Sequence, residues 1–195
     1  MKEQTGKLPR RVNAEYLENA ALHYLGRFAS SSANLRRVLM AKVERSARAH
    51  GTDRDEGAAL VETLIERYRR SGVLDDRAYA EAKATSLHRR GTSTRAIRGK
   101  LALKGVETEL VDAALSAVDD DTPGDTELTA AVALARRRRL GPFRSGVRAD
   151  YRDKDLAALG RAGFSYAIAR TVIDSDDPAN FVGPENPVGS SGDQE

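Results

Sequence analysis

Short segments with apolar residues three or four positions apart follow one another along most of this chain, which is the pattern of amphipathic helices. Glycine separates many of these segments, at Gly72, Gly91, Gly105 and Gly163, where a helix can end. No stretch shows the sustained alternation of apolar and polar residues that a half-buried strand requires. The sequence therefore predicts an all-α protein.

Nine short helices are expected, and they form three sets of three. Their predicted ranges are 14–28, 35–48, 58–70, 77–89, 94–103, 109–118, 127–138, 154–161 and 166–173. Moving the second set back by 62 positions places Ile97 on Leu35. The same shift places Leu101 on Leu39, and Leu159 corresponds to Leu101 in the third set. Because one set of about 50 residues buries too little surface to be stable alone, we expect a tandem array of three three-helix repeats, elongated or curved.

Segments of different composition separate the repeats. The predicted organisation is a disordered arm (1–13), repeat 1 (14–70), the central repeat 2 (71–118), a linker (119–125), repeat 3 (126–173) and a disordered acidic tail (174–195). Within repeat 1, the polar segment 49–57 is expected to be a loop. The expected core residues are Leu35, Leu39, Tyr79, Ile97, Leu101, Leu115, Leu159 and Phe164.

The residues that enzymes and metal sites require are absent or scattered. The chain has no cysteine, which excludes disulfides and thiolate chemistry. His23, His50 and His88 lack the spacing of metal ligands. Segment 91–100 has the wrong glycine spacing for a phosphate-binding loop, and Leu101 replaces the hydroxyl residue that would bind magnesium. We predict that the protein is not an enzyme and has no catalytic residue, metal, cofactor or small-molecule substrate.

Two acidic residues and the first residues of the chain have simple explanations. Asp75 and Asp76 stand directly before a helix, where an N-cap and a first-turn acid are both stabilising. Residues 1–11 are polar and basic, and nowhere do 18 apolar residues follow one another. We therefore expect neither classical secretion nor contact with a membrane. The protein is also expected to be a monomer.

Charge is segregated along the chain, although the formal net charge is only +3. Residues 83–104 contain seven basic side chains and no acid, whereas residues 105–127 contain eight acids and no basic side chain. Such separation favours an anionic partner. Six basic side chains of the first block are predicted to contact it, namely Arg89, Arg90, Arg95, Arg98, Lys100 and Lys104.

The helix near Thr94 is expected to bury Ile97 and Leu101, so that its basic side chains face elsewhere. A cap by Ser93 or Thr94 would leave backbone N–H groups free beside them, which suits a phosphate or a carboxylate. The alternative is that these cations are solvated and balanced by ion pairs with the acidic helix that follows Glu107.

A second basic surface is predicted at Arg136, Arg137, Arg138 and Arg139. Cations at a helix end complement the helix dipole, but four consecutive arginines exceed what a helix end needs. Because consecutive helical residues point in different directions, some of the four must face outward, and Arg144 and Arg148 would extend the patch. Binding of a polyanion through backbone contacts is the hypothesis.

Segments 72–83 and 89–106 carry a combination of motifs. Asp75 and Asp76 follow a leucine, a Tyr-Ala pair comes next, a basic pair precedes Gly91, and an isoleucine helix ends in Lys104 and Gly105. This combination resembles the central repeat of the RecX family, and segment 154–173 is similar to the third repeat of that family. The resemblance covers about residues 14–173.

The resemblance implies a cytoplasmic regulator of the RecA recombinase in DNA recombination, repair and the SOS response. It would lie along the groove of the RecA filament on DNA and typically damp strand exchange, ATP hydrolysis and co-protease activity, or alter filament assembly. Two other readings stay open from the residues alone. A general helical DNA-binding protein would contact the DNA backbone without a recombinase. A helical adaptor for an acidic protein would show no dependence on DNA.

Overall fold

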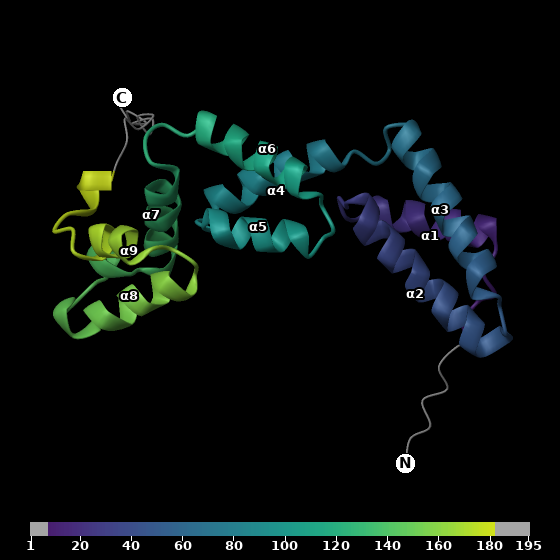
Figure 1. Ribbon diagram of the computed structural model, residues 1–195. Coiled ribbons are helices and arrows are strands. Elements are labelled where there is room, and N and C mark those ends of the chain that lie inside the picture. Colours follow the sequence, from purple (N-terminus) through teal and green to yellow (C-terminus); the bar gives the residue numbers. More distant parts are fainter. Residues whose placement is uncertain (1–7, 182–195) are drawn as a thin grey trace, which may run out of the picture. The chain divides into compact units, whose positions relative to one another are not determined.

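The computed structural model describes residues 8–181 (Figure 1). Over this range the secondary structure is entirely helical, so the all-α prediction is confirmed. The nine α-helices are α1 (Ala14–Leu25), α2 (Ser32–His50), α3 (Arg54–Arg70), α4 (Asp76–Arg89), α5 (Thr94–Ala102), α6 (Thr108–Asp120), α7 (Thr126–Arg138), α8 (Arg152–Arg161) and α9 (Tyr166–Ile173). Three short 3-10 helices are η1 (Gly141–Phe143), η2 (Ala149–Tyr151) and η3 (Pro178–Phe181).

Two compact units make up the chain. Unit 1 comprises Met1–Thr85 and Arg98–Ala117, and unit 2 comprises Ser86–Ile97 and Val118–Glu195. The division passes through α4, α5 and α6, so each unit contains segments that are distant in sequence. The arm, repeat and linker boundaries given above remain predictions.

The core of unit 1 lies between α1, α2 and α3, which Figure 1 shows packed together. Leu35, Leu39 and Val43 follow one another at four-residue spacing on α2, and all three are fully buried. They meet Leu17 of α1 and Val61 of α3 in one apolar cluster. The four-residue apolar spacing of the sequence therefore located this core correctly.

The loop predicted at 49–57 is much shorter in the structure. Helix α2 continues to His50 and ends at Gly51, whose φ of 65° is the left-handed conformation of a helix C-cap. Asp53 caps α3 by accepting from the N–H of Asp55 at 2.7 Å. Gly57 lies inside α3, where a Cβ would come within 2.4 Å of Val43 Cγ1. The polar composition that suggested a loop thus reflects a helix cap, and the glycine permits close packing of two helices.

The core of unit 2 lies between α7, α8 and α9. Helix α7 contributes the small residues Ala130, Ala131 and Ala135, all buried, which lets the other helices approach it closely. Leu159 of α8 and Phe164 fill the space between them. Both residues were expected in the core. Of the eight predicted core residues only Tyr79 is half-buried rather than buried, and this burial raises the pKa of its hydroxyl.

The same polar contact, called a joint below, occurs once in each unit: a serine hydroxyl caps one helix and donates to the backbone carbonyl before a distant glycine. In unit 1, the Ser31 hydroxyl caps α2 and donates to the carbonyl of Lys104, directly before Gly105. In unit 2, the Ser93 hydroxyl caps α5 and donates to the carbonyl of Ala162 at 2.8 Å, directly before Gly163. Each serine therefore binds the turn before the third helix of the next predicted repeat, which is α6 for Ser31 and α9 for Ser93.

A carboxylate completes each joint. The N–H of Ser32 donates to the Asp76 carboxylate at 2.7 Å, and the N–H of Thr94 donates to the Glu127 carboxylate at 2.6 Å. Asp75 caps α4 by accepting from the N–H of Ala78 at 2.9 Å, as predicted. Asp76, expected to serve only its own helix, in fact binds the start of α2.

The described chain extends beyond the predicted helical core at both ends. Val12 is buried, and its N–H donates to the Ser46 hydroxyl at 2.9 Å, although disorder was predicted for residues 1–13. Helix η3 lies within the tail for which disorder was predicted, and Phe181 packs against the core of unit 2. In both segments a single apolar residue, Val12 or Phe181, packs against a core, although the surrounding residues are polar and suggested disorder. Residues 1–7 and 182–195 lie outside the described residues.

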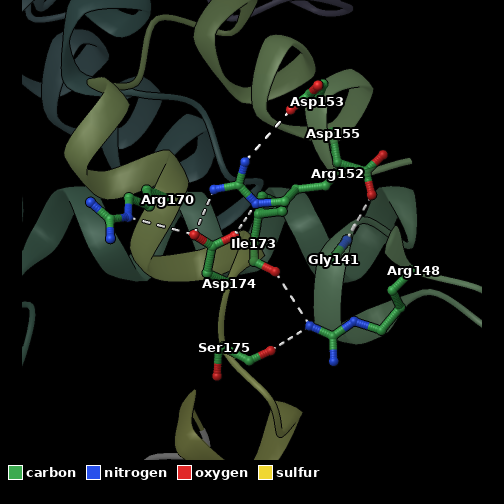
Figure 2. Close-up of polar contacts among 9 residues, drawn as sticks. All are labelled: Gly141, Arg148, Arg152, Asp153, Asp155, Arg170, Ile173, Asp174 and Ser175. Carbon is green, nitrogen blue, oxygen red and sulfur yellow. Dashed lines mark hydrogen bonds and ion pairs between the residues drawn. The ribbon is translucent and has the colours of Figure 1, made fainter. Parts of the chain in front are cut away.

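Arginines fasten the C-terminal end of α9 (Figure 2). Arg152 donates to both carboxylate oxygens of Asp174, each at 2.7 Å, and Arg170 lies 3.5 Å from the same carboxylate. Arg148 donates to the carbonyl oxygen of Ile173, the last residue of α9, which has no partner within the helix, and to that of Ser175 just beyond the helix. These bonds hold the turn after α9 against the start of α8.

Replacing Asp174 with asparagine should remove a pH-dependent contribution to stability. The hydrogen bond from Arg152 lowers the pKa of Asp174 below its ordinary value of 3.8. A depressed carboxyl pKa stabilises the fold above the unfolded value, and this stabilisation is lost as the pH falls through the folded pKa. The difference in Tm between wild type and Asp174→Asn should therefore be largest at neutral pH and shrink below about pH 4. A difference in Tm that did not change with pH would contradict this role.

Candidate functional site

Seven arginines of unit 2 form the candidate site. All seven side chains are exposed, and they are called the arginine cluster below: Arg89, Arg90, Arg95, Arg136, Arg137, Arg138 and Arg139. The end of α4 and the residue after it supply the first two, and α5 supplies the third. The last turn and C-cap of α7 supply the other four, where cations complement the helix dipole.

Part of the first predicted basic surface is joined to the second within unit 2. The Arg137 guanidinium donates to the carbonyl oxygen of Arg90, which joins the end of α7 to the turn after α4. Gly91 allows this approach, because a Cβ on it would lie 2.4 Å from the Leu134 backbone nitrogen. Its φ of 73° also requires the left-handed conformation that glycine adopts without strain.

The arginine cluster is not neutralised by neighbouring acids. Between residues 8 and 181, no carboxylate oxygen lies within the 4.0 Å ion-pair distance of any of its seven guanidinium groups. In the part of the chain that the structure describes, the predicted balance by the acidic helix α6 is found for Arg98 alone, which pairs with Asp112 in unit 1. Seven exposed cations without carboxylate partners create a strongly positive surface, which favours a polyanion.

Three of the predicted site residues belong to unit 1. Arg98 and Lys100 are exposed, and Lys104 is half-buried with its ammonium nitrogen 3.4 Å from the Asn34 side-chain oxygen. Arg37 donates to the same Asn34 oxygen and to the carbonyl of Leu103 at 3.2 Å. Arg37 was not predicted, because its neighbours in sequence do not reveal that α2 brings it beside Lys104.

Two of the N–H groups at the start of α5 are occupied. Ser93 accepts from the N–H of Ala96 at 3.3 Å, and the Glu127 carboxylate accepts from the N–H of Thr94. A protein carboxylate therefore already binds one of the N–H groups predicted to be free for a phosphate or carboxylate. The predicted cap by Ser93 is confirmed, whereas the N–H of Thr94 is bound by Glu127 and is not free.

Arg144 and Arg148 do not extend the patch as predicted. Arg144 donates two hydrogen bonds to Asp155, at 2.6 and 3.2 Å, and hydrogen bonding to this carboxylate raises the pKa of the Arg144 guanidinium. Arg148 binds backbone carbonyl oxygens at the end of α9. Both side chains are therefore engaged in holding unit 2 together.

Arg139 occupies a backbone conformation that glycine would adopt more easily. Its φ of 54° and ψ of 53° are left-handed, and no other non-glycine residue between 8 and 181 has a positive φ. A left-handed conformation costs an L-residue roughly 1 kcal/mol. Compared with glycine, arginine at this C-cap therefore lowers the stability of the fold, but it places an exposed cation on the surface.

Arg139→Gly should stabilise the protein by about 1 kcal/mol in urea denaturation, because glycine removes the left-handed strain. The same substitution at its neighbour should act in the opposite sense. Arg138 is the last helical residue of α7, so Arg138→Gly should destabilise the protein by about 0.5–1 kcal/mol. Equal effects of the two substitutions would show that the backbone of Arg139 is not strained.

Other ligand chemistry receives no support from the described residues. In residues 8–181, no group of three or more His, Asp or Glu side chains lies close enough together to hold a metal ion. Across the same part of the chain, no helix has the length and apolar character needed to cross a membrane.

Comparison with known proteins agrees with the fold. Residues 75–115 match the family model for RecX, second three-helix domain. The regulatory protein RecX of Myxococcus xanthus is 51% identical over 177 residues, which are 90% of this chain and 93% of that protein. Regulatory protein RecX of Thermobifida fusca is 32% identical over 135 residues, or 68% of this chain and 70% of the relative.

A solved structure shares the architecture. The crystal structure of RecX from Lactobacillus salivarius aligns with a TM-score of 0.55 over 83% of this chain and 94% of that chain, at 21% identity. The fold is thus that of an all-α helical-repeat protein, with the exposed arginine cluster on unit 2. The similarity to the Myxococcus xanthus protein covers nearly the whole length of both chains, and the protein belongs to the RecX family of regulatory proteins.

Proposed function

We propose that this protein regulates the RecA recombinase in the cytoplasm by binding the RecA–DNA filament, and that its binding inhibits strand exchange, ATP hydrolysis and co-protease activity. Family membership supports a regulatory role. The observation that carries the proposal is the arginine cluster of unit 2, whose seven exposed cations lack carboxylate partners among residues 8–181.

The filament offers the chemistry that this surface requires. A nucleoprotein filament repeats the same acidic groups and DNA phosphates along its length, so several weak contacts can form at once. Contacts made by one rigid unit combine into high affinity, because each contact after the first is intramolecular. The basic side chains Arg98, Lys100 and Lys104 of unit 1, with Arg37 beside Lys104, would add contacts of the same kind.

A titration of RecA from the same source tests the proposal. Single-strand-dependent ATP hydrolysis and strand exchange would be measured with increasing amounts of the purified protein at constant salt concentration. We expect both activities to fall at protein concentrations below that of RecA. Unchanged activity at saturating protein would contradict the proposal, and activity restored by excess free DNA would indicate simple competition for DNA instead.

A further inference from the structure

The turn between α5 and α6 in unit 1 is held against the start of α2 by three contacts. The carbonyl oxygen of Lys104 accepts from the Ser31 hydroxyl, and that of Leu103 accepts from the Arg37 guanidinium at 3.2 Å. A Cβ on Gly105 would lie 2.5 Å from an alanine Cβ of α2, so the turn and the helix are in close contact. The backbone of this turn is therefore fixed by α2.

Two cations meet beside this turn. The Arg37 guanidinium donates to the side-chain oxygen of Asn34 at 2.5 Å, and the Lys104 ammonium lies 3.4 Å from the same oxygen. Asn34 is only 4% exposed, and its amide nitrogen donates to the hydroxyl groups of Tyr24 at 2.9 Å and Ser30 at 2.8 Å. A buried amide, with its nitrogen and its oxygen both engaged, thus holds two like charges close together.

This pair of cations has no acidic neighbour in the described structure. Between residues 8 and 181, no carboxylate oxygen lies within the 4.0 Å ion-pair distance of Arg37 or Lys104. Two like charges held together repel each other, whereas an anion bound between them would be attracted by both. Arg37 is exposed and Lys104 is half-buried, so an anion can reach them. The geometry is therefore suited to bind an anionic group from outside unit 1.

The corresponding joint of unit 2 forms without such a pair. Ser93 donates there to a backbone carbonyl at 2.8 Å, as Ser31 does in unit 1. Alignment of the two joints shows small side chains or none in place of the amide and the two cations, at Ala96, Gly99 and Ala162. The joint itself therefore does not require the two cations, and a role outside the fold accounts for them better.

Leu103 gives the cation pair an apolar neighbour. It directly precedes Lys104 and is 74% exposed, although the backbone of its turn is fixed. The equivalent residue of unit 2 is Arg161. An exposed leucine offers nothing to a phosphate, whereas an apolar side chain beside an acidic one on a protein surface would cover it. The combination therefore favours a protein carboxylate over a nucleic-acid phosphate.

We propose that Arg37 and Lys104 bind a carboxylate side chain of an acidic protein surface, while Leu103 packs against an apolar side chain beside that carboxylate. A guanidinium has five N–H donors, so Arg37 can bind a carboxylate and keep its bonds to α2 and to the turn. The inference rests on the proposed function, in which RecA supplies the acidic surface. It assigns this site of unit 1 to the protein part of the filament and not to the DNA.

Zero-length cross-linking tests the contact directly. A water-soluble carbodiimide joins a lysine amine to a carboxylate that touches it, and peptide mass spectrometry locates the link. In the assembled filament, we expect Lys104 to become linked to an aspartate or glutamate of RecA. Lys42 on α2 is the control, because its ammonium lies 5.5 Å from the Tyr16 ring centroid and outside the proposed site. No link at Lys104, or equal yields at Lys104 and Lys42, would overturn the inference.

Neutral substitutions separate protein contacts from DNA contacts. Arg37→Gln with Lys104→Gln should inhibit RecA strand exchange roughly tenfold less potently, yet bind a labelled oligothymidylate with wild-type affinity in fluorescence anisotropy. Lys42→Gln with Arg45→Gln removes the same charges from another part of α2 and should inhibit like wild type. Undiminished inhibition by the first variant, or a parallel loss of inhibition and oligothymidylate affinity, would overturn the inference. The parallel loss would indicate phosphate contacts instead.

Leu103→Ser tests the apolar part of the site without risk to the fold, because the side chain is exposed. We expect roughly threefold weaker inhibition and unchanged oligothymidylate affinity, and inhibition equal to that of wild type would contradict the packing of Leu103 on RecA. Circular dichroism would verify that all variants are folded. Failure of the proposed function is distinguishable, because the wild-type protein itself would then not inhibit RecA, whereas the cross-link would still report the contact.

Discussion

Asp155→Ala is expected to destabilise the protein by about 3–5 kcal/mol, which is a large fraction of the stability of a domain. Asp155 is only 3% exposed and lies on α8. Its carboxylate accepts from the N–H of Gly141 at 2.9 Å and from Arg144 at 2.6 and 3.2 Å (Figure 2 shows the bond to Gly141). Alanine would leave a partly buried guanidinium and a buried backbone N–H without partners, which accounts for the large cost.

Urea denaturation followed by circular dichroism would measure this loss. The matched control is Asp153→Ala on the same helix, because the Asp153 side chain is 96% exposed and lies 3.6 Å from Arg152. An exposed ion pair of this kind contributes at most about 1 kcal/mol. If the two alanine variants lost equal stability, the contacts of Asp155 with Gly141 and Arg144 would not make the expected large contribution to stability.

Gly91→Ala is expected to destabilise the protein by about 3 kcal/mol or more. Two costs combine, because alanine is strained at a φ of 73° and because its Cβ would lie 2.4 Å from the Leu134 nitrogen and 2.7 Å from the Ala130 oxygen. Both contacts are with the backbone of α7, which cannot move aside as a flexible side chain would. The turn after α4 would be pushed away from α7, and the bond from Arg137 to Arg90 would be lost.

The same substitution at a helical glycine of unit 2 should have the opposite effect. Gly160 lies within α8, and a Cβ added to it meets no atom within 4 Å. Gly160→Ala should therefore stabilise the protein by about 0.5–1 kcal/mol. Comparable destabilisation by the two alanine substitutions would contradict the close approach of Gly91 to α7.

The spacing of apolar residues predicted the helices well, because the formation of an amphipathic helix depends on residues that are close together in the sequence. Apolar residues at four-residue spacing, such as Leu35 and Leu39, must face one side of a helix, and burial of that side follows directly. Capping is also local, and Asp75 was recognised as a cap from its place before α4. Polar composition gave the wrong result at 49–57, because Gly57 supports close packing inside a helix and does not mark a loop.

Contacts between distant residues could not be predicted in the same way. The bond from Arg137 to the carbonyl of Arg90 joins residues 47 positions apart, and only the folded unit reveals it. The bond from Ser93 to Ala162 spans 69 positions. The sequence therefore identified the arginines of the candidate site but not their meeting in unit 2. It likewise gave no sign that Arg144 would be neutralised by Asp155.

Charge reversal at the arginine cluster tests the central claim most directly. Arg89→Glu with Arg90→Glu would be compared with Arg69→Glu with Arg70→Glu in the inhibition of RecA strand exchange at constant salt. The two pairs carry the same charge, are exposed and lie at the end of a helix, but only the first belongs to the cluster. We expect the first variant to lose about tenfold or more in inhibitory potency, and the second to inhibit like wild type. Undiminished inhibition by the first variant, or an equal loss in both, would contradict the assignment of regulation to the arginine cluster.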